Sequence, residues 1–178
     1  MVTAEDLVQL YGFEPLLVEG GMYTQTYRAV ELIPHAVLPD RYTGDKPFGT
    51  AILYLYTSDD NSFSAMHKLP TDEIYHFYLG DPVELLQLYP DGRSERVTLG
   101  QNVLAGQKVQ YVASRGVWMG SHLLPGGTFA LIGTTIAPGF TNDDYVGGAR
   151  EMLIQHYPHE TELIVRLTRP GEALRMPS

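Results

Sequence analysis

The sequence contains no cysteine, which excludes disulfide bonds, thiolate metal sites and a thiol nucleophile. It is also poor in positive charge, because 12 Lys and Arg residues face 21 Asp and Glu residues and leave a formal net charge of −9. Affinity for a phosphate backbone or an anionic bilayer comes from clustered basic side chains. We therefore expect neither a nucleic acid nor a membrane as a partner, although a locally basic pocket could still bind an anionic ligand.

Long apolar runs are absent as well. Runs such as residues 51–56 are far too short to span a bilayer, and the N-terminal sequence MVTAEDLVQLYGF lacks the basic and apolar regions of a secretory signal. These features favour a soluble, cytoplasmic protein. No linker, internal repeat or low-complexity segment divides the 178 residues, so we predict a single domain over residues 1–178.

What the chain does contain is a succession of short segments rich in β-branched and aromatic residues, separated by turns with glycine and proline. In Tyr89-Pro90-Asp91-Gly92, proline presets φ and glycine accepts the positive φ that a hairpin turn requires. The pattern predicts an all-β sandwich or barrel with its core over about residues 20–140. The expected strands cover residues 23–30, 50–57, 63–69, 73–79, 83–89, 94–99, 108–113, 117–124 and 128–137.

Helices are expected only at the two ends of the chain. At the N-terminus, Thr3 and Asp6 have the spacing of a capping box and Gly12 is placed to end a short helix. Near the C-terminus, apolar residues recur every three or four positions in residues 149–154 and 162–167. A helical tail over about residues 147–170 is therefore predicted.

The most informative segment is HKLPTDEIYHFYLGDP, residues 67–82. His67, Glu73 and Gly80 fall at the offsets of the first cupin motif, whereas the second motif is degraded in SRGVWM, residues 114–119. The chain resembles the cupin family catalogued as a domain of unknown function, DUF985 (also called Cupin_5). Four signatures carry this resemblance in the right order: EGGMYTQTYR at 19–28, DEIYHF at 72–77, GVW at 116–118 and GTTIAPGF at 133–140.

The resemblance covers roughly residues 5–170 and implies a double-stranded β-helix, the jelly-roll or cupin barrel. It also implies a homodimer and a relationship in fold to sugar-nucleotide epimerases such as dTDP-4-dehydrorhamnose 3,5-epimerase. It does not imply a settled reaction, because one fold hosts many chemistries. Residues 23–30 are the segment expected to form the dimer contact, because they could add a strand to the sheet edge of a partner.

Metal-loaded cupins use two histidines and a glutamate from the first motif and a histidine from the second. Here Leu69 stands at the second histidine position and Met119, a soft ligand, at the last. His67, Glu73 and His76 could still hold a divalent metal as a facial triad. Strand alternation opposes this, because His76 points away from the barrel if Glu73 points inward, unless a bulge intervenes. We therefore expect no cofactor, with a divalent metal at these three residues as the alternative.

General acid–base chemistry is the leading interpretation of the same residues. A histidine–carboxylate pair in an apolar pocket is suited to abstracting a proton next to a carbonyl. We predict His67 as the base, oriented by Glu73, with His76 nearby as a third catalytic residue.

Several further residues are candidates for contact with the ligand. The tyrosines could supply the opposing acid or fill the barrel with their hydroxyls bonded to backbone. The arginine could bind a carboxylate or phosphate, or pair with an acid at a subunit interface. The single tryptophan could stack on the ligand or plug the barrel end. These candidates are Tyr23, Tyr27, Arg28, Tyr54, Tyr75 and Trp118.

Together these features predict a small-molecule-binding protein, with an isomerase or epimerase acting on a sugar or sugar-derived acid as the leading hypothesis. The alternatives are a non-catalytic metabolite-binding module and a metal-dependent oxygenase. The proline-containing loop at residues 31–47 either closes over the pocket or lies on the surface.

Overall fold

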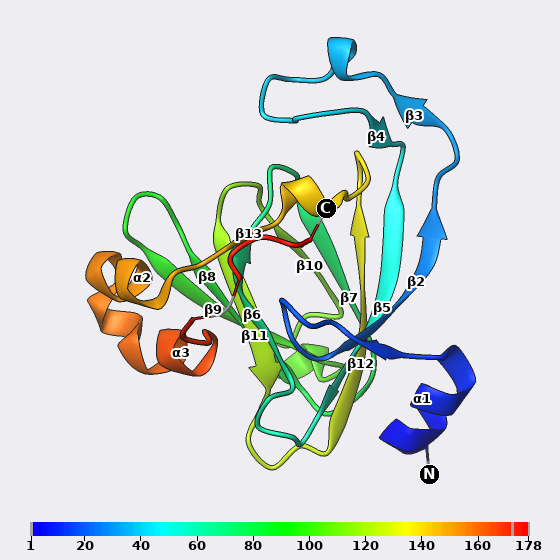
Figure 1. Cartoon of the computed structure of the whole chain (residues 1–178). Coiled ribbons are helices and arrows are strands. Elements are labelled where there is room, and N and C mark those ends of the chain that lie inside the picture. Colours follow the sequence, from blue (N-terminus) through cyan, green and yellow to red (C-terminus); the bar gives the residue numbers. More distant parts are fainter. Residues whose placement is uncertain (1, 172, 178) are drawn as a thin grey trace.

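The computed structural model describes residues 2–171 and 173–177, and its main body is two antiparallel sheets that face each other (Figure 1). The first sheet has the strand order β1-β2-β5-β12-β7-β10 and the second β13-β6-β11-β8-β9. The strands of the first sheet are β1 (Glu14–Pro15), β2 (Met22–Arg28), β5 (Thr50–Thr57), β12 (Phe129–Ile136), β7 (Glu73–Gly80) and β10 (Gln110–Ala113). Those of the second are β13 (Val146–Gly147), β6 (Phe63–Lys68), β11 (Trp118–Leu123), β8 (Val83–Leu88) and β9 (Ser94–Leu99).

Short helices flank the sheets. The α-helices are α1 (Ala4–Tyr11), α2 (Arg150–His156) and α3 (Thr161–Arg166). The 3₁₀ turns are η1 (His35–Val37), η2 (Val103–Ala105), η3 (Asn142–Asp144) and η4 (Pro158–Glu160). Among the described residues, no helix combines the length and the apolar character that crossing a bilayer would require.

The structure confirms the all-β expectation with helices at both ends of the chain. Each segment expected to be a strand contains one, and α2 and α3 occupy the expected tail. The capping box of Thr3 and Asp6 is formed, and Gly12 ends α1 with φ 65°. The sequence pattern missed only strands of two residues, namely β1, β13 and the β3 (Leu32–Ile33) and β4 (Lys46–Pro47) pair. Such short strands carry no alternation that a pattern could reveal.

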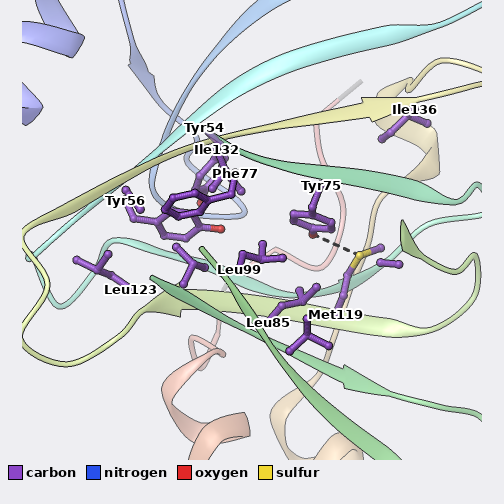
Figure 2. Close-up of a cluster of buried hydrophobic side chains, with 14 of the residues drawn as sticks. Tyr54, Tyr56, Tyr75, Phe77, Leu85, Leu99, Met119, Leu123, Ile132 and Ile136 are labelled. Carbon is purple, nitrogen blue, oxygen red and sulfur yellow. Dashed lines mark hydrogen bonds between the residues drawn. The ribbon is translucent and has the colours of Figure 1, made fainter. Parts of the chain in front are cut away.

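The main core lies between the two sheets, where inward residues of alternate positions meet (Figure 2). Tyr54, Phe77, Leu85 and Ile132 belong to this cluster, and each is at least nine-tenths buried. A second cluster forms where α2 and α3 cover the outer face of the second sheet. Because β6 is covered on both faces, its residues Phe63 to His67 are all buried. Packing on both sides therefore holds β6, which carries His67, in a fixed position.

The loop at residues 31–47 does not close over the pocket. It forms the β3–β4 hairpin, which projects from one end of the barrel (Figure 1), and none of its residues lines the main cavity. The loop is anchored instead, because Tyr42 Oη lies 2.8 Å from Thr71 Oγ1 and the buried Lys46 donates to Asp144 at 2.6 Å. Asp144 belongs to η3, which lies within the segment at residues 140–145 that lines the cavity, so the hairpin supports the cavity wall from outside.

Candidate active site

A cavity of about 670 Å³ lies at the end of the barrel where β2, β5, β12, β7 and β6 converge. The turn between β1 and β2 and the segment at residues 140–145 complete its wall. Four of the residues predicted from the sequence line it, namely His67, Glu73, Tyr23 and Arg28. Its size falls within the usual range for small-molecule sites.

One row of cross-strand partners spans this cavity. Arg28 pairs with Thr50, Thr50 with Ile136, and Ile136 with Glu73 across four neighbouring strands of the first sheet. All four residues line the cavity. Adjacent strands lie about 4.8 Å apart, so the backbones of Arg28 and Glu73 are separated by at most about 14 Å. The exposed Arg28 thus marks the mouth of the cavity, and the buried Glu73 its inner end.

A bulge in β2 determines which side chain reaches the cavity. The register with β5 shifts between Gln25 and Tyr27, after which Arg28 is opposite Thr50. Without the shift, alternation from Tyr23 and Gln25 would turn Tyr27 inward. With it, Arg28 lines the cavity, while Tyr27 lies outside it and is 56% exposed.

A second bulge, in β6, positions His67. His67 is opposite Met119 and Ser64 is opposite Ser121, so Ala65 and Met66 together face a single residue of β11. The Nδ1 atom of His67 lies 2.8 Å from the carbonyl oxygen of Ala65. Because a carbonyl only accepts, Nδ1 carries a hydrogen, and Nε2 is the nitrogen directed at Glu73.

His67 and Glu73 form a buried pair from opposite sheets. The Nε2 atom of His67 lies 3.8 Å from Oε2 of Glu73, and the hydroxyl of Tyr75 donates to the same oxygen at 3.2 Å. Burial by itself disfavours the imidazolium, but the carboxylates of Glu19 and Glu73 outweigh it and raise the pKa of His67 to about 9. At neutral pH this pKa favours a protonated His67, whereas the prediction from the sequence was a free base.

The remaining predicted residues lie outside the cavity. His76 points away from it, as strand alternation predicts, and its Nε2 lies 3.2 Å from Thr135 Oγ1. The hydroxyl of Tyr54 donates to the carbonyl of Gly20 at 2.6 Å, in agreement with the barrel-filling alternative. Tyr75 lies in the core, where its hydroxyl approaches Met119 Sδ at 3.5 Å (Figure 2). Trp118 packs in the cluster under α2 and α3, with Lys68 Nζ 4.6 Å from its ring centroid.

The sequence of the chain matches a known family over most of its length. A family model described as "Cupin superfamily (DUF985)" matches residues 5–146. This chain belongs to the DUF985 family of cupins. Its expected double-stranded β-helix fold is thereby confirmed.

Two solved structures resemble this DUF985 cupin over nearly the whole chain. Protein SO0799 from Shewanella oneidensis is 28% identical, with a TM-score of 0.81 over 96% of this chain and 100% of that one. A hypothetical protein from Leishmania major is 24% identical, with a TM-score of 0.81 over 94% of this chain and 99% of that one, and supports the fold alone.

One curated relative matches part of the chain. The uncharacterized protein YML079W of Saccharomyces cerevisiae is 31% identical over 99 residues, which are 54% of this chain. The match spans 48% of the yeast protein, about half its length.

The metal that some cupins hold does not fit the residues of this site. His76 lies outside the cavity that His67 and Glu73 line, so the facial triad considered as the alternative is not assembled. Leu69 lines the cavity where a second histidine ligand would be needed, and Met119 directs its sulfur toward the hydroxyl of Tyr75. In the part of the chain that the structure describes, no group of three or more His, Cys, Asp or Glu residues could hold an ion.

Sequence reasoning missed two residues at the centre of the site. Tyr145 stacks on His67 with ring centroids 5.1 Å apart, and Glu19 lines the cavity from the turn between β1 and β2. For Glu19 a signal was present, because an acidic residue directly precedes the Gly20-Gly21 turn of the first family signature. Tyr145 has no comparable signal, since it reaches the cavity only through the path of residues 140–145.

Proposed function

We propose that this cupin is an isomerase- or epimerase-like enzyme that acts on a sugar or sugar-derived acid by proton transfer. The observation that carries the proposal is the buried His67–Glu73 pair at the inner end of a ligand-sized cavity whose mouth holds Arg28. Buried acid–base pairs with a strongly shifted pKa, placed in a cavity, are typical of catalytic sites. The relation of the fold to sugar-nucleotide epimerases supports this reaction class by analogy only.

In the proposed reaction each group has one step. Glu73 accepts a proton from a carbon atom next to a carbonyl of the substrate, and the electron pair of that C–H bond forms the new C=C bond. The imidazolium of His67 stabilises the negative charge that develops on the carbonyl oxygen. Return of the proton to the other face of the same carbon gives an epimer. Return to the former carbonyl carbon gives an isomer, provided that the neighbouring hydroxyl transfers its proton to the former carbonyl oxygen and itself becomes the new carbonyl.

Arg28 gives the site its preference for an acid. Its Nη1 donates to the carbonyl oxygen of Phe140 at 3.1 Å, which fixes the guanidinium beside the segment at residues 140–145. The remaining N–H groups of a guanidinium can bind a carboxylate with two parallel hydrogen bonds. A ligand with a carboxylate at one end and a carbonyl at the other would therefore extend from Arg28 to the His67–Glu73 pair.

We also propose that a second copy of this chain is a partner. Strand β1 pairs only with Met22 and Tyr23, so the rest of β2 forms a sheet edge among the described residues. Large apolar side chains gather beside this edge with more than half of their surface exposed. They are Tyr27 at 56%, Val30 at 95%, Leu32 at 52% and Phe48 at 52%. An apolar sheet edge of this kind is suited to pairing with its own copy.

The test of the catalytic proposal is exchange of carbon-bound hydrogen in D₂O, followed by ¹H NMR. The probes are D-glucuronate and D-galacturonate, whose open-chain forms carry a carbonyl, with D-glucose as a control that lacks a carboxylate. We expect deuterium incorporation into at least one acidic probe, its loss by at least about 100-fold in Glu73→Gln and His67→Asn, and no effect of chelator. An Arg28→Met variant should bind the acidic probe no better than it binds D-glucose.

Three outcomes would contradict the proposal. Tight binding of a probe without exchange would indicate a non-catalytic metabolite-binding module. Exchange that disappears with chelator and returns with a divalent metal would indicate metal-dependent chemistry. Full exchange in the Glu73→Gln variant would place the reaction elsewhere.

A further inference from the structure

The turn between β1 and β2 brings a second carboxyl group to the His67–Glu73 pair. The turn crosses from the first sheet to β6 (Figure 1), where the backbone oxygen of Glu19 accepts from the N–H of Ala65 at 2.8 Å. The Oε1 atom of Glu19 accepts from the hydroxyl of Ser64 at 2.5 Å. Backbone and side chain of Glu19 are thus both attached to the strand that carries His67, and all three acid–base groups line one cavity.

The two glycines after Glu19 make this placement possible. Gly20 has φ +99°, and a Cβ there would lie 2.4 Å from the carbonyl oxygen of Phe63. Gly21 has φ +61°, and a Cβ there would lie 2.3 Å from the hydroxyl of Tyr54. Only glycine lets the backbone press this closely against the barrel. The fold therefore contains a specific arrangement that delivers a glutamate side chain to the cavity.

The partners of the two carboxyl groups differ in kind. Glu73 faces the imidazolium of His67 and accepts from Tyr75, whereas the hydrogen bond of Glu19 comes from the neutral hydroxyl of Ser64. Two carboxylates around one imidazolium in a confined cavity repel each other, so one proton is favoured between them. The proton is therefore favoured on Glu19, because its hydrogen-bond partner is the neutral hydroxyl of Ser64 rather than an imidazolium.

The surroundings of Glu19 agree with this assignment. Burial raises the pKa of the Glu19 carboxyl, the His67 imidazolium opposes this effect, and the Glu73 carboxylate adds to it. Arg169 also approaches the turn, with its guanidinium near Gly20, and donates to the carbonyl of Asn61 at 2.8 Å. The other titratable side chains around this group are Tyr54, Tyr56, Tyr75 and Tyr145.

We propose that Glu19 carries a proton in the free site and acts as the catalytic acid, donating it to the carbonyl oxygen of the substrate. This step rests on the proposed function. As Glu73 takes the proton from carbon, the π electron pair of the carbonyl forms the bond to the Glu19 proton, which gives a neutral enediol or enol and leaves Glu19 ionised. The reverse transfers return both protons, so no oxidant, reductant or co-reactant is needed.

The proposal narrows the class of substrate. The reacting end must present a carbonyl next to a C–H bond to Glu19 and Glu73, while the carboxylate end reaches Arg28. An open-chain uronic acid or a keto sugar acid has both features. A fully reduced sugar acid lacks the carbonyl and would be a ligand without turnover.

The first experiment locates the proton without any ligand. Carboxyl ¹³C resonances of protein labelled at glutamate Cδ are followed by NMR titration in wild type, Glu19→Gln, Glu73→Gln and the exposed control Glu162→Gln. We expect one glutamate with a raised pKa that is missing only in Glu19→Gln, and a lower pKa for it in Glu73→Gln. The inference is overturned if the raised resonance is missing in Glu73→Gln instead, or if no glutamate titrates above its ordinary range.

The second experiment tests the acid step with the uronate probes in D₂O. The amide of Glu19→Gln can still donate a hydrogen bond but cannot give a proton, so we expect probe affinity to stay within about threefold. Exchange should slow by about 100-fold, and the decline in rate at high pH that follows Glu19 ionisation should disappear. An unchanged rate and pH profile would overturn the acid role. A wild-type protein that exchanges no probe would overturn the proposed function together with this acid step. The NMR titration shows independently whether Glu19 carries the proton.

Discussion

His67 shows how the surroundings of one residue set its chemical role. Its Nδ1–H is bonded to the backbone of Ala65, so only Nε2 is available to Glu73 and to a ligand. Burial lowers the pKa of His67, but the Glu19 carboxylate, once it has ionised, and the Glu73 carboxylate outweigh this effect and raise that pKa to about 9. The sequence predicts His67 as the base; we propose Glu73 as the base instead, because the raised pKa of His67 favours its imidazolium form at neutral pH.

A pH titration of His67 follows directly from these contacts. We expect its ring resonances to titrate near pH 9 in ¹H–¹³C NMR spectra, and at a lower pH in Glu73→Gln and Glu19→Gln. Removing the exposed carboxylate in Glu162→Gln should leave the titration unchanged. A His67 that titrates at its ordinary value in wild type would contradict the assignment of the proton.

The same shift predicts how stability depends on pH. The pKa of His67 is raised from its ordinary value of 6.5 in the folded state, so the folded chain binds the proton more tightly than the unfolded chain. The resulting stabilisation is fully present below about pH 6.5 and is lost as the pH rises through about 9. Thermal unfolding should show Tm falling over this window, and falling less in His67→Gln. An equal fall in both proteins would assign the effect to other groups.

At the scale of elements, two bulges and one turn build the site. The bulge in β2 exchanges Tyr27 for Arg28 at the cavity, and the bulge in β6 leaves the N–H of Ala65 free to bond the turn at Glu19. Bulges of this kind redirect side chains at the cost of ladder hydrogen bonds. The turn at Gly20-Gly21 binds one of the backbone groups that the β6 bulge leaves unpaired, because the carbonyl oxygen of Glu19 accepts from the N–H of Ala65.

Two glycines with similar φ but different surroundings can test the fit of this turn. Gly20 (φ +99°) is crowded by Phe63, whereas a Cβ added at Gly92 (φ +89°) would meet nothing within 4 Å. Gly92→Ala should lower the free energy of unfolding by about 1–2 kcal/mol through backbone strain alone. Gly20→Ala should cost roughly 1–3 kcal/mol more, because the turn must move away from β6. Urea denaturation measures both, and equal losses would show that the turn is not pressed against the barrel.

At the scale of the whole molecule, the proposed dimer would form next to the candidate site. Strand β2, which presents Tyr27 to solvent shortly before the exposed Val30, also carries Gln25 and Arg28, which line the cavity. A partner on this edge would therefore lie close to the entrance for ligand. Dimer formation and ligand binding should consequently influence each other.

Sedimentation velocity tests the proposed dimer. We expect wild type to sediment as a dimer and Tyr27→Asp/Val30→Asp as a monomer, because two charges would be buried without partners at the interface. Leu104→Asp is the matched control, since Leu104 is 99% exposed but belongs to η2, far along the chain from β2. A dimer that survives in the double variant, or a monomeric wild type, would contradict the proposal.

The sequence by itself determined the strands, their turns and the family to which the chain belongs. Alternation in β7 was enough to place Glu73 inside and His76 outside, because side-chain direction in a regular strand depends only on local backbone geometry. Only the tertiary structure decided that Arg28 rather than Tyr27 lines the cavity, and that Glu19 lines it together with His67 and Glu73. Both outcomes depend on bulges, and a bulge is defined by pairing with strands distant in the sequence, which no local pattern records.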